Sequence, residues 1–201
     1  YPKQYHFSLD DWCVDGLLGP LAERRVPLFI GSSGPIRASG ADETDWRGVV
    51  RLCRAFPDLP VVALEDRNFT TLWTMYQALE SCPNLHVELS GLLYHRIVEF
   101  ICREWGAERL LFGTAMPVRD PGVTLGQLNY SEVSEADLAA IAGGNLRRLL
   151  SWTRTPVPEV AFPEPVDELH AAIRERRSLR GQGFLCGHGH LGNHHYLHVV
   201  D

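Results

Sequence analysis

The sequence lacks the features of a membrane protein and of a nucleic-acid-binding protein. No apolar run approaches the roughly 20 residues that a membrane-spanning helix needs. A basic surplus is also missing, because 19 Lys and Arg stand against 25 Asp and Glu, which leaves a formal net charge of -6. Proteins that bind nucleic acid usually present a basic face. We therefore expect no membrane and no nucleic acid among the partners of this protein.

Cysteine is too sparse and too irregularly placed for a disulfide framework. The five cysteines are an odd number, and no two of them form a C-x-x-C pair. The N-terminal residues show no signal peptide, although the sequence opens with Tyr1 rather than a methionine. Both observations favour a protein of the reducing cytoplasm.

Short apolar runs alternate with longer stretches of helical periodicity over residues 1–154. Alternation of this kind favours a parallel sheet whose strands are neighbours in sequence order, with the helices on one face. A full eight-stranded barrel takes about 250 residues, so this chain is too short for one. The predicted fold class is α/β, a partial (β/α)8 TIM-barrel-like structure that is either a half-barrel or a segment of something longer. The predicted strands are residues 26–30, 61–64, 86–89 and 110–112, and the predicted helices between them are residues 45–56, 71–81 and 94–105.

Three polar residues mark predicted turns and helix starts after the last of these strands. Ser134, followed three residues later by Asp137, is typical of a helix N-cap. Asn145 is predicted to cap a further helix that bears leucines. Asp120 stands directly before Pro121 and a glycine, which predicts a turn.

The composition changes after residue 154. The prolines of residues 155–165 predict a linker, and residues 166–180 can form a charged amphipathic helix. Residues 155–182 thus separate the barrel segment from a last segment, residues 183–201, which opens with a short predicted strand.

Five landmarks run in order through residues 9–150: "RRVPLFI", "FPDLPVVAL", "PNLHVELSGL", "GAERLLFGTAMP" and "IAGGNLRRLL". In their order and spacing they resemble the last four strands of the barrel of the amidohydrolase-related family, which includes the aminocarboxymuconate semialdehyde decarboxylase-like enzymes. The terminal "GGN" followed by a leucine-bearing helix is similar to the usual ending of that family. The resemblance implies a barrel of the metal-dependent hydrolase type.

The tail segment "CGHGHLG" resembles the opening strand of the same family, which carries an H-x-H pair. On a strand, His188 and His190 would point to the same side and could hold one divalent cation together, with zinc as the expected metal. Further histidines follow at His194, His195 and His198, so a tract that binds metal only loosely is the alternative. The order of late strands, linker and opening strand is compatible with a fused second barrel, a rearranged barrel or a gene fragment.

Three positions depart from the ligand pattern that the resemblance implies. Gly31 and Glu65 stand where the family usually places a histidine, and Ala115 stands where it places an aspartate that takes part in proton transfer. No catalytic residue is therefore carried over from the resemblance. Glu65 is the third candidate metal ligand, because it follows a buried strand; its alternative is a structural ion pair with Arg67.

Two more histidines lie outside this pattern. His86 alternates with a valine on a predicted strand, which favours a packed or solvent-facing ring over a metal ligand. His95 lies near a predicted helix start without an evident partner in the sequence.

Two functions follow from these patterns. The first is a metal-dependent hydrolase or decarboxylase of a small organic substrate, in which the metal would activate water and polarise a carbonyl. The second is a non-catalytic barrel that lacks the usual ligands and acts as a structural or regulatory partner. In either case a partial barrel leaves open sheet edges, which favours a homo-oligomer or pairing with a homologous barrel.

Overall fold

The structure, a computed structural model, describes residues 2, 8–31, 44–64, 72–116 and 120–154, and the backbone of residues 183–188 and 195–200. The chain divides into two compact units, Tyr1–Pro156 and Val157–Asp201. Among the described residues, no helix is both long enough and apolar enough to cross a membrane.

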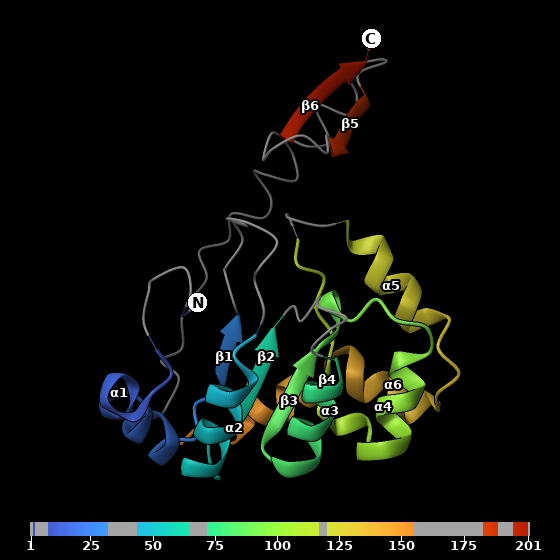
Figure 1. The fold of residues 1–201 in the computed structure, drawn as a ribbon. Coiled ribbons are helices and arrows are strands. Elements are labelled where there is room, and N and C mark those ends of the chain that lie inside the picture. The colour runs from blue at the N-terminus through green and yellow to red at the C-terminus, as the bar shows by residue number, and fades with distance from the viewer. Residues whose placement is uncertain are drawn as a thin grey trace. The chain divides into compact units, whose positions relative to one another are not determined.

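The first unit is built on a parallel sheet of four strands (Figure 1). The strands neighbour one another in sequence order, which confirms the predicted arrangement. Leu28 pairs with Val61, and Val61 pairs with Leu85, so the strands start together at one edge of the sheet and end together at the other. The strands are β1 (Leu28–Gly31), β2 (Val61–Leu64), β3 (Leu85–Glu88) and β4 (Leu110–Leu111).

Helices and short helical turns connect these strands. They are α1 (Asp11–Glu23), α2 (Trp46–Ala55), α3 (Leu72–Ser81), η1 (Leu89–Gly91), α4 (Ile97–Trp105), η2 (Ala107–Arg109), α5 (Pro121–Asn129), α6 (Glu135–Ala139), η3 (Ala140–Gly144) and α7 (Asn145–Ser151). Ser134 caps α6 as predicted, because its side chain accepts a hydrogen bond from the Asp137 N–H. The prediction for Asp120 was incomplete, since this residue caps α5 by accepting from the Gly122 N–H.

Helices cover both faces of the sheet, which corrects the prediction that they lie on one face. Val61 and Ala63 of β2 belong to the large core cluster that includes the apolar residues of α2, α3 and α4. Val62 lies between them in sequence and therefore points to the opposite face. There it packs with Leu111 of β4 and with Leu149 of α7. An apolar face must be covered to be stable, and α7 provides the cover on this side.

The second unit contains an antiparallel pair of strands, β5 (Gly183–His188) and β6 (His195–Val200). The strand predicted at the start of this segment is thus present, and it ends at His188, which pairs with His195. The predicted linker and the predicted helix at residues 166–180 lie outside the described residues.

Candidate functional site

The carboxyl ends of β1–β4 meet at one edge of the sheet, where barrel enzymes place their chemistry. Gly31 and Leu64 end β1 and β2 opposite each other, and Glu88 ends β3. Gly113, Thr114 and Ala115 follow β4, and Ala115 has a left-handed backbone with φ of 52°. Gly31 and Ala115, two of the three positions that differ from the family's ligand pattern, therefore bring no polar side chain to this edge. Glu65, the third, lies outside the described residues.

Glu88 is an acidic group that the structure brings to this edge, and it was not among the candidate residues predicted from the sequence. Its side chain is only 8% exposed. One carboxylate oxygen accepts the Ser90 N–H at 2.8 Å, and the other accepts the Ser90 hydroxyl at 2.6 Å. Glutamate is seldom buried unless its oxygens are satisfied. The available signal was an acidic residue at the end of a predicted buried strand, followed by Ser-Gly.

Gly113 makes room for the Glu88 carboxylate. A Cβ atom at Gly113 would lie 2.1 Å from Glu88 Oε1, far inside van der Waals contact. The glycine after β4 is thus a condition for the position of the Glu88 carboxylate at the end of β3. Glu88 is held from both sides, by the Ser90 hydrogen bonds and by the close backbone of Gly113.

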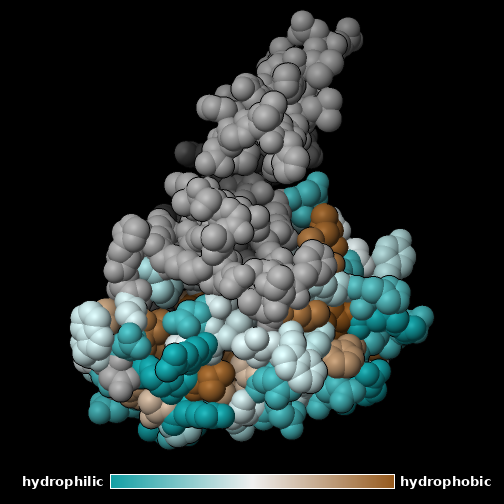
Figure 2. All heavy atoms as spheres, viewed as in Figure 1, coloured by the Kyte–Doolittle hydropathy of each residue, from teal (hydrophilic) through white to brown (hydrophobic). Residues whose placement is uncertain are grey.

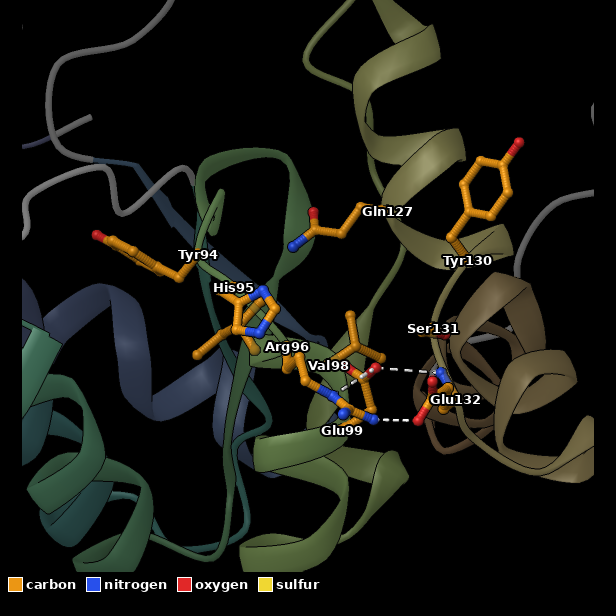
Figure 3. A pocket seen from close by; sticks show the side chains of 10 residues that line it. Tyr94, His95, Arg96, Val98, Glu99, Gln127, Tyr130, Ser131 and Glu132 are labelled. Carbon is orange, nitrogen blue, oxygen red and sulfur yellow. Dashed lines mark hydrogen bonds and ion pairs between the residues drawn. The ribbon is translucent and has the colours of Figure 1, made fainter.

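A pocket of about 290 Å³ lies between the loop that follows β3 and the end of α5 (Figure 3). Arg96 stands at its centre in a left-handed conformation, with φ of 53°. Its guanidinium pairs with Glu99 on one side and with Glu132 on the other. Gln127 Nε2 donates to the Leu92 carbonyl at 2.6 Å, while its Oε1 is buried with no hydrogen-bond partner among the described residues.

Arg96 shares its positive charge between the two glutamates of this pocket. Burial alone would raise the pKa of the Glu99 carboxyl, but the hydrogen bond from the Glu132 N–H, Arg96 and His95 together lower it below its ordinary value. Glu99 therefore stays ionised and holds Arg96 in place. His95 lies at the pocket wall, so it has charged neighbours that the sequence did not indicate (Figure 3).

His86 is a packed histidine, which is one of the two arrangements that the sequence favoured for it. Its ring is 5% exposed, and Nδ1 donates to the Glu108 carbonyl at 2.9 Å. Burial lowers the pKa of His86 to about 4, and the charges of Arg109 and Arg148 act in the same direction. The ring is therefore neutral at pH 7.

The described residues do not fit a divalent metal on their own. They contain no group of three or more His, Cys, Asp or Glu side chains that could hold one. Of the predicted ligands, Glu65 and His190 lie outside the described residues, and for His188 only the backbone is described. We assign no reaction step to a metal.

Solved structures with the same sheet and helix arrangement are TIM-barrel proteins. An uncharacterized TIM-barrel protein of Bordetella bronchiseptica matches with a TM-score of 0.60 and 24% identity, over 73% of this chain and 53% of that chain. A 2,6-dihydroxybenzoate decarboxylase from Rhizobium matches with a TM-score of 0.53 and 16% identity, over 68% of this chain and 54% of that one. A 5-carboxyvanillate decarboxylase from Sphingomonas paucimobilis matches with a TM-score of 0.52 and 18% identity, over 67% of this chain and 52% of that chain. The fold is thus a partial TIM barrel.

The particular family is established by sequence. The Amidohydrolase family matches residues 21–152, most of the chain, so this chain belongs to that family. It spans about half the length of the solved structures that it matches. No curated protein matches the sequence.

Proposed function

We propose that this chain is part of a metal-dependent hydrolase or decarboxylase that acts on a small organic substrate at the carboxyl edge of β1–β4. Membership of the Amidohydrolase family supports the class of reaction. Two of the structural neighbours are decarboxylases of hydroxylated or methoxylated aromatic acids, and a dihydroxybenzoic acid decarboxylase from a Polaromonas species holds manganese and the inhibitor 2-nitroresorcinol. A small aromatic acid is the substrate class we propose.

The single observation that carries this proposal is the buried carboxylate of Glu88. It stands at the end of a barrel strand, with its two oxygens oriented by Ser90. A carboxylate that is held in one orientation in a poorly solvated place is suited to accept or return a proton during the reaction. In our proposal, Glu88 is the acid–base group of this half of the barrel.

The metal of this enzyme is part of the same proposal. Zinc is our first expectation, and manganese is the metal held by a structural neighbour. His188 and His190 are the ligands that we propose for a cation, and Glu65 is a separate candidate ligand, since carboxylate and neutral imidazole are suitable ligands for both metals. When bound, the metal supplies Lewis-acid chemistry.

We also propose that the open sheet edges pair with other barrel strands, from a second copy or from a homologous barrel. Four strands form this sheet in the described part of the chain, and β1 is one of its two edge strands. Phe29 on β1 is 42% exposed, so an apolar ring is left at that edge. We expect the protein in the cytoplasm, where its four described cysteines, which are free thiols, would stay reduced.

Replacing Glu88 by Gln tests the role of the carboxylate. The amide keeps the shape but cannot accept a proton, so kcat for release of carbon dioxide should fall by about 10²- to 10⁴-fold. The assay uses the full chain with added zinc or manganese, and 2,6-dihydroxybenzoate or 5-carboxyvanillate as substrate. Glu104→Gln is the control, because that glutamate lies on the exposed side of α4 and pairs only with the neighbouring Arg103 in the described structure.

Equal kcat in the parent and the Glu88→Gln protein would remove Glu88 from the mechanism. If the parent neither turns over nor binds these acids in the presence of metal, the enzyme proposal fails. The non-catalytic barrel would then be the better account of this chain.

A further inference from the structure

A second cavity, of about 470 Å³, lies at the opposite edge of the sheet, where the strands begin. Turns ahead of β2, β3 and β4 line it, together with the end of α7. It is separated from Glu88 by the length of β3, and so it is not part of the site at the carboxyl edge. The charged residues that line it are Arg25, Asp58, Glu108, Arg109 and Arg148, and His86 and Trp152 line it as well.

The three arginines of this cavity have different roles. The Arg109 guanidinium is used for backbone contacts, since it donates hydrogen bonds to the carbonyls of Leu85, Leu79 and Cys82. Arg25 pairs with the exposed carboxylate of Asp58 at 2.7 Å. Arg148 reaches only neutral acceptors within the described part of the chain.

Arg148 is a cation without a counter-charge in the described structure. It donates to the Glu108 carbonyl at 3.2 Å and to the Asn145 side-chain oxygen at 3.4 Å, both long contacts. Its guanidinium carbon lies 5.5 Å from the centre of the Trp152 ring. Within the described residues its Nε, like that of Arg25, makes no hydrogen bond, but both atoms are buried, so a ligand would bind the terminal guanidinium nitrogens. A guanidinium arranged in this way has unused capacity to bind an anion.

The backbone supports the same interpretation at Arg25. This residue follows the end of α1 with φ of 52°, in the left-handed region that usually selects glycine at a helix end. The Arg25 side chain lines the same cavity as Arg148. Two guanidiniums from distant parts of the chain thus line one cavity.

His86 and Trp152 also line the cavity and add an acceptor and an apolar surface to it. The His86 Nδ1–H is occupied by the Glu108 carbonyl, so the neutral ring offers Nε2 as an acceptor for a hydroxyl. The Trp152 ring, stacked with Arg148, offers a flat apolar wall for carbon atoms.

We propose that this cavity binds a small organic oxyanion, a carboxylate or a phosphate monoester, at a site distinct from the proposed catalytic edge. Arg148 holds the negative oxygens, Arg25 adds a second positive charge, and the Trp152 ring packs on the carbon part of the ligand. The proposal does not depend on the catalytic activity of the chain.

Titration calorimetry of the full chain with benzoate and with phenyl phosphate, at constant ionic strength, tests this site. Arg148→Gln should weaken the binding of the preferred anion by about tenfold or more, because a charge-assisted hydrogen bond is lost. Arg147→Gln is the matched control, since Arg147 is the exposed neighbour on the same helix and does not line the cavity. Tighter binding of phenyl phosphate would identify the ligand as a phosphate, and tighter binding of benzoate as a carboxylate.

A second variant keeps the test independent of folding defects. Asp58 is exposed and competes for Arg25, so Asp58→Asn should tighten binding severalfold without disturbing the core. The proposal is overturned if neither anion binds the parent at millimolar concentration, or if Arg148→Gln and Asp58→Asn bind both anions as the parent does.

Discussion

His86 shows how the tertiary environment changes the chemistry of a single side chain. In the sequence it is one of nine histidines and has an ordinary strand position. In the fold it is buried at the start of β3, beside Arg109 and Arg148, and it donates to the Glu108 carbonyl. Burial and the two positive charges keep the ring neutral, so protonation of His86 opposes folding.

Replacing His86 by Gln should remove a pH-dependent part of the stability. The pKa of His86 is about 4 in the fold against an ordinary 6.5, so between these pH values the unfolded chain binds a proton that the folded chain does not. The free energy of unfolding of the parent should therefore fall as the pH drops from 6.5 to 4, by on the order of 3 kcal/mol from this residue. Above pH 6.5 the contribution of the neutral His86 ring to the free energy of unfolding is fully present.

Urea unfolding over this pH range measures the effect, with His95→Gln as the control because His95 is exposed. The Gln variant retains an amide donor for the Glu108 carbonyl, and its pH dependence should be flatter than that of the parent. Parallel curves for the parent and the His86→Gln protein would show that His86 does not carry the effect.

At the scale of the elements, α7 is held to the sheet by Asn145. Asn145 was predicted from the sequence as the cap of this helix, and that prediction was wrong. The backbone of Asn145 is already helical, and Gly144 holds the N-cap position. Its side-chain amide instead donates to the carbonyls of Ala107 and Leu110, both at 2.8 Å. These bonds fasten α7 to the start of β4.

Asn145→Ala should lower the free energy of unfolding by about 2–3 kcal/mol, because two buried carbonyls lose their donor. Urea denaturation of the variant and the parent gives the difference. Asn129→Ala is the control, since Asn129 is exposed at the end of α5. If the free energy of unfolding falls no more than in the control, water replaces the hydrogen bonds of the Asn145 amide without loss of stability.

Element boundaries followed the sequence only where local signals were strong. The helix predicted from residue 94 begins at Ile97, because Arg96 takes a left-handed conformation that ends any helix before it. Helix α5 was missed although Asp120 followed by Pro121 is a known start signal, since two glycines weaken its helical pattern. Strand β4 ends one residue early, because the Phe112 N–H bonds to the Ile141 carbonyl.

For the whole molecule, the surface of the first unit and the division of the proposed metal ligands between the units bear on function. On the face of the first unit seen in Figure 2, hydrophobic residues form small separate patches among hydrophilic ones. The proposed metal ligands are divided between the two units, with Glu65 in the first and the two histidines of the H-x-H pair in the second. Metal content tests the H-x-H pair of the second unit by itself.

Replacing His188 and His190 together by Ala should abolish stoichiometric metal in the full chain. Imidazole binds metal only when neutral, so the metal affinity of the parent should fall as the pH drops through about 6.5. Elemental analysis after extensive dialysis measures the bound metal. The protein with His194, His195 and His198 replaced is the control and should retain it. Equal metal in the His188/His190 variant and the parent would exclude this pair as ligands.

The sequence by itself determined the class of fold and the family, because apolar runs at strand spacing and ordered landmarks are local features of the chain. It placed the four parallel strands and recognised that Gly31 and Ala115 bring no ligand to their carboxyl edge. The tertiary structure alone decided which polar groups meet. Glu88 fits against Gly113 only because β3 and β4 are paired, and Arg25 and Arg148 share a cavity only because α7 packs back on the sheet. Burial and charge proximity depend on these long-range contacts, and they decide the chemistry of the side chains.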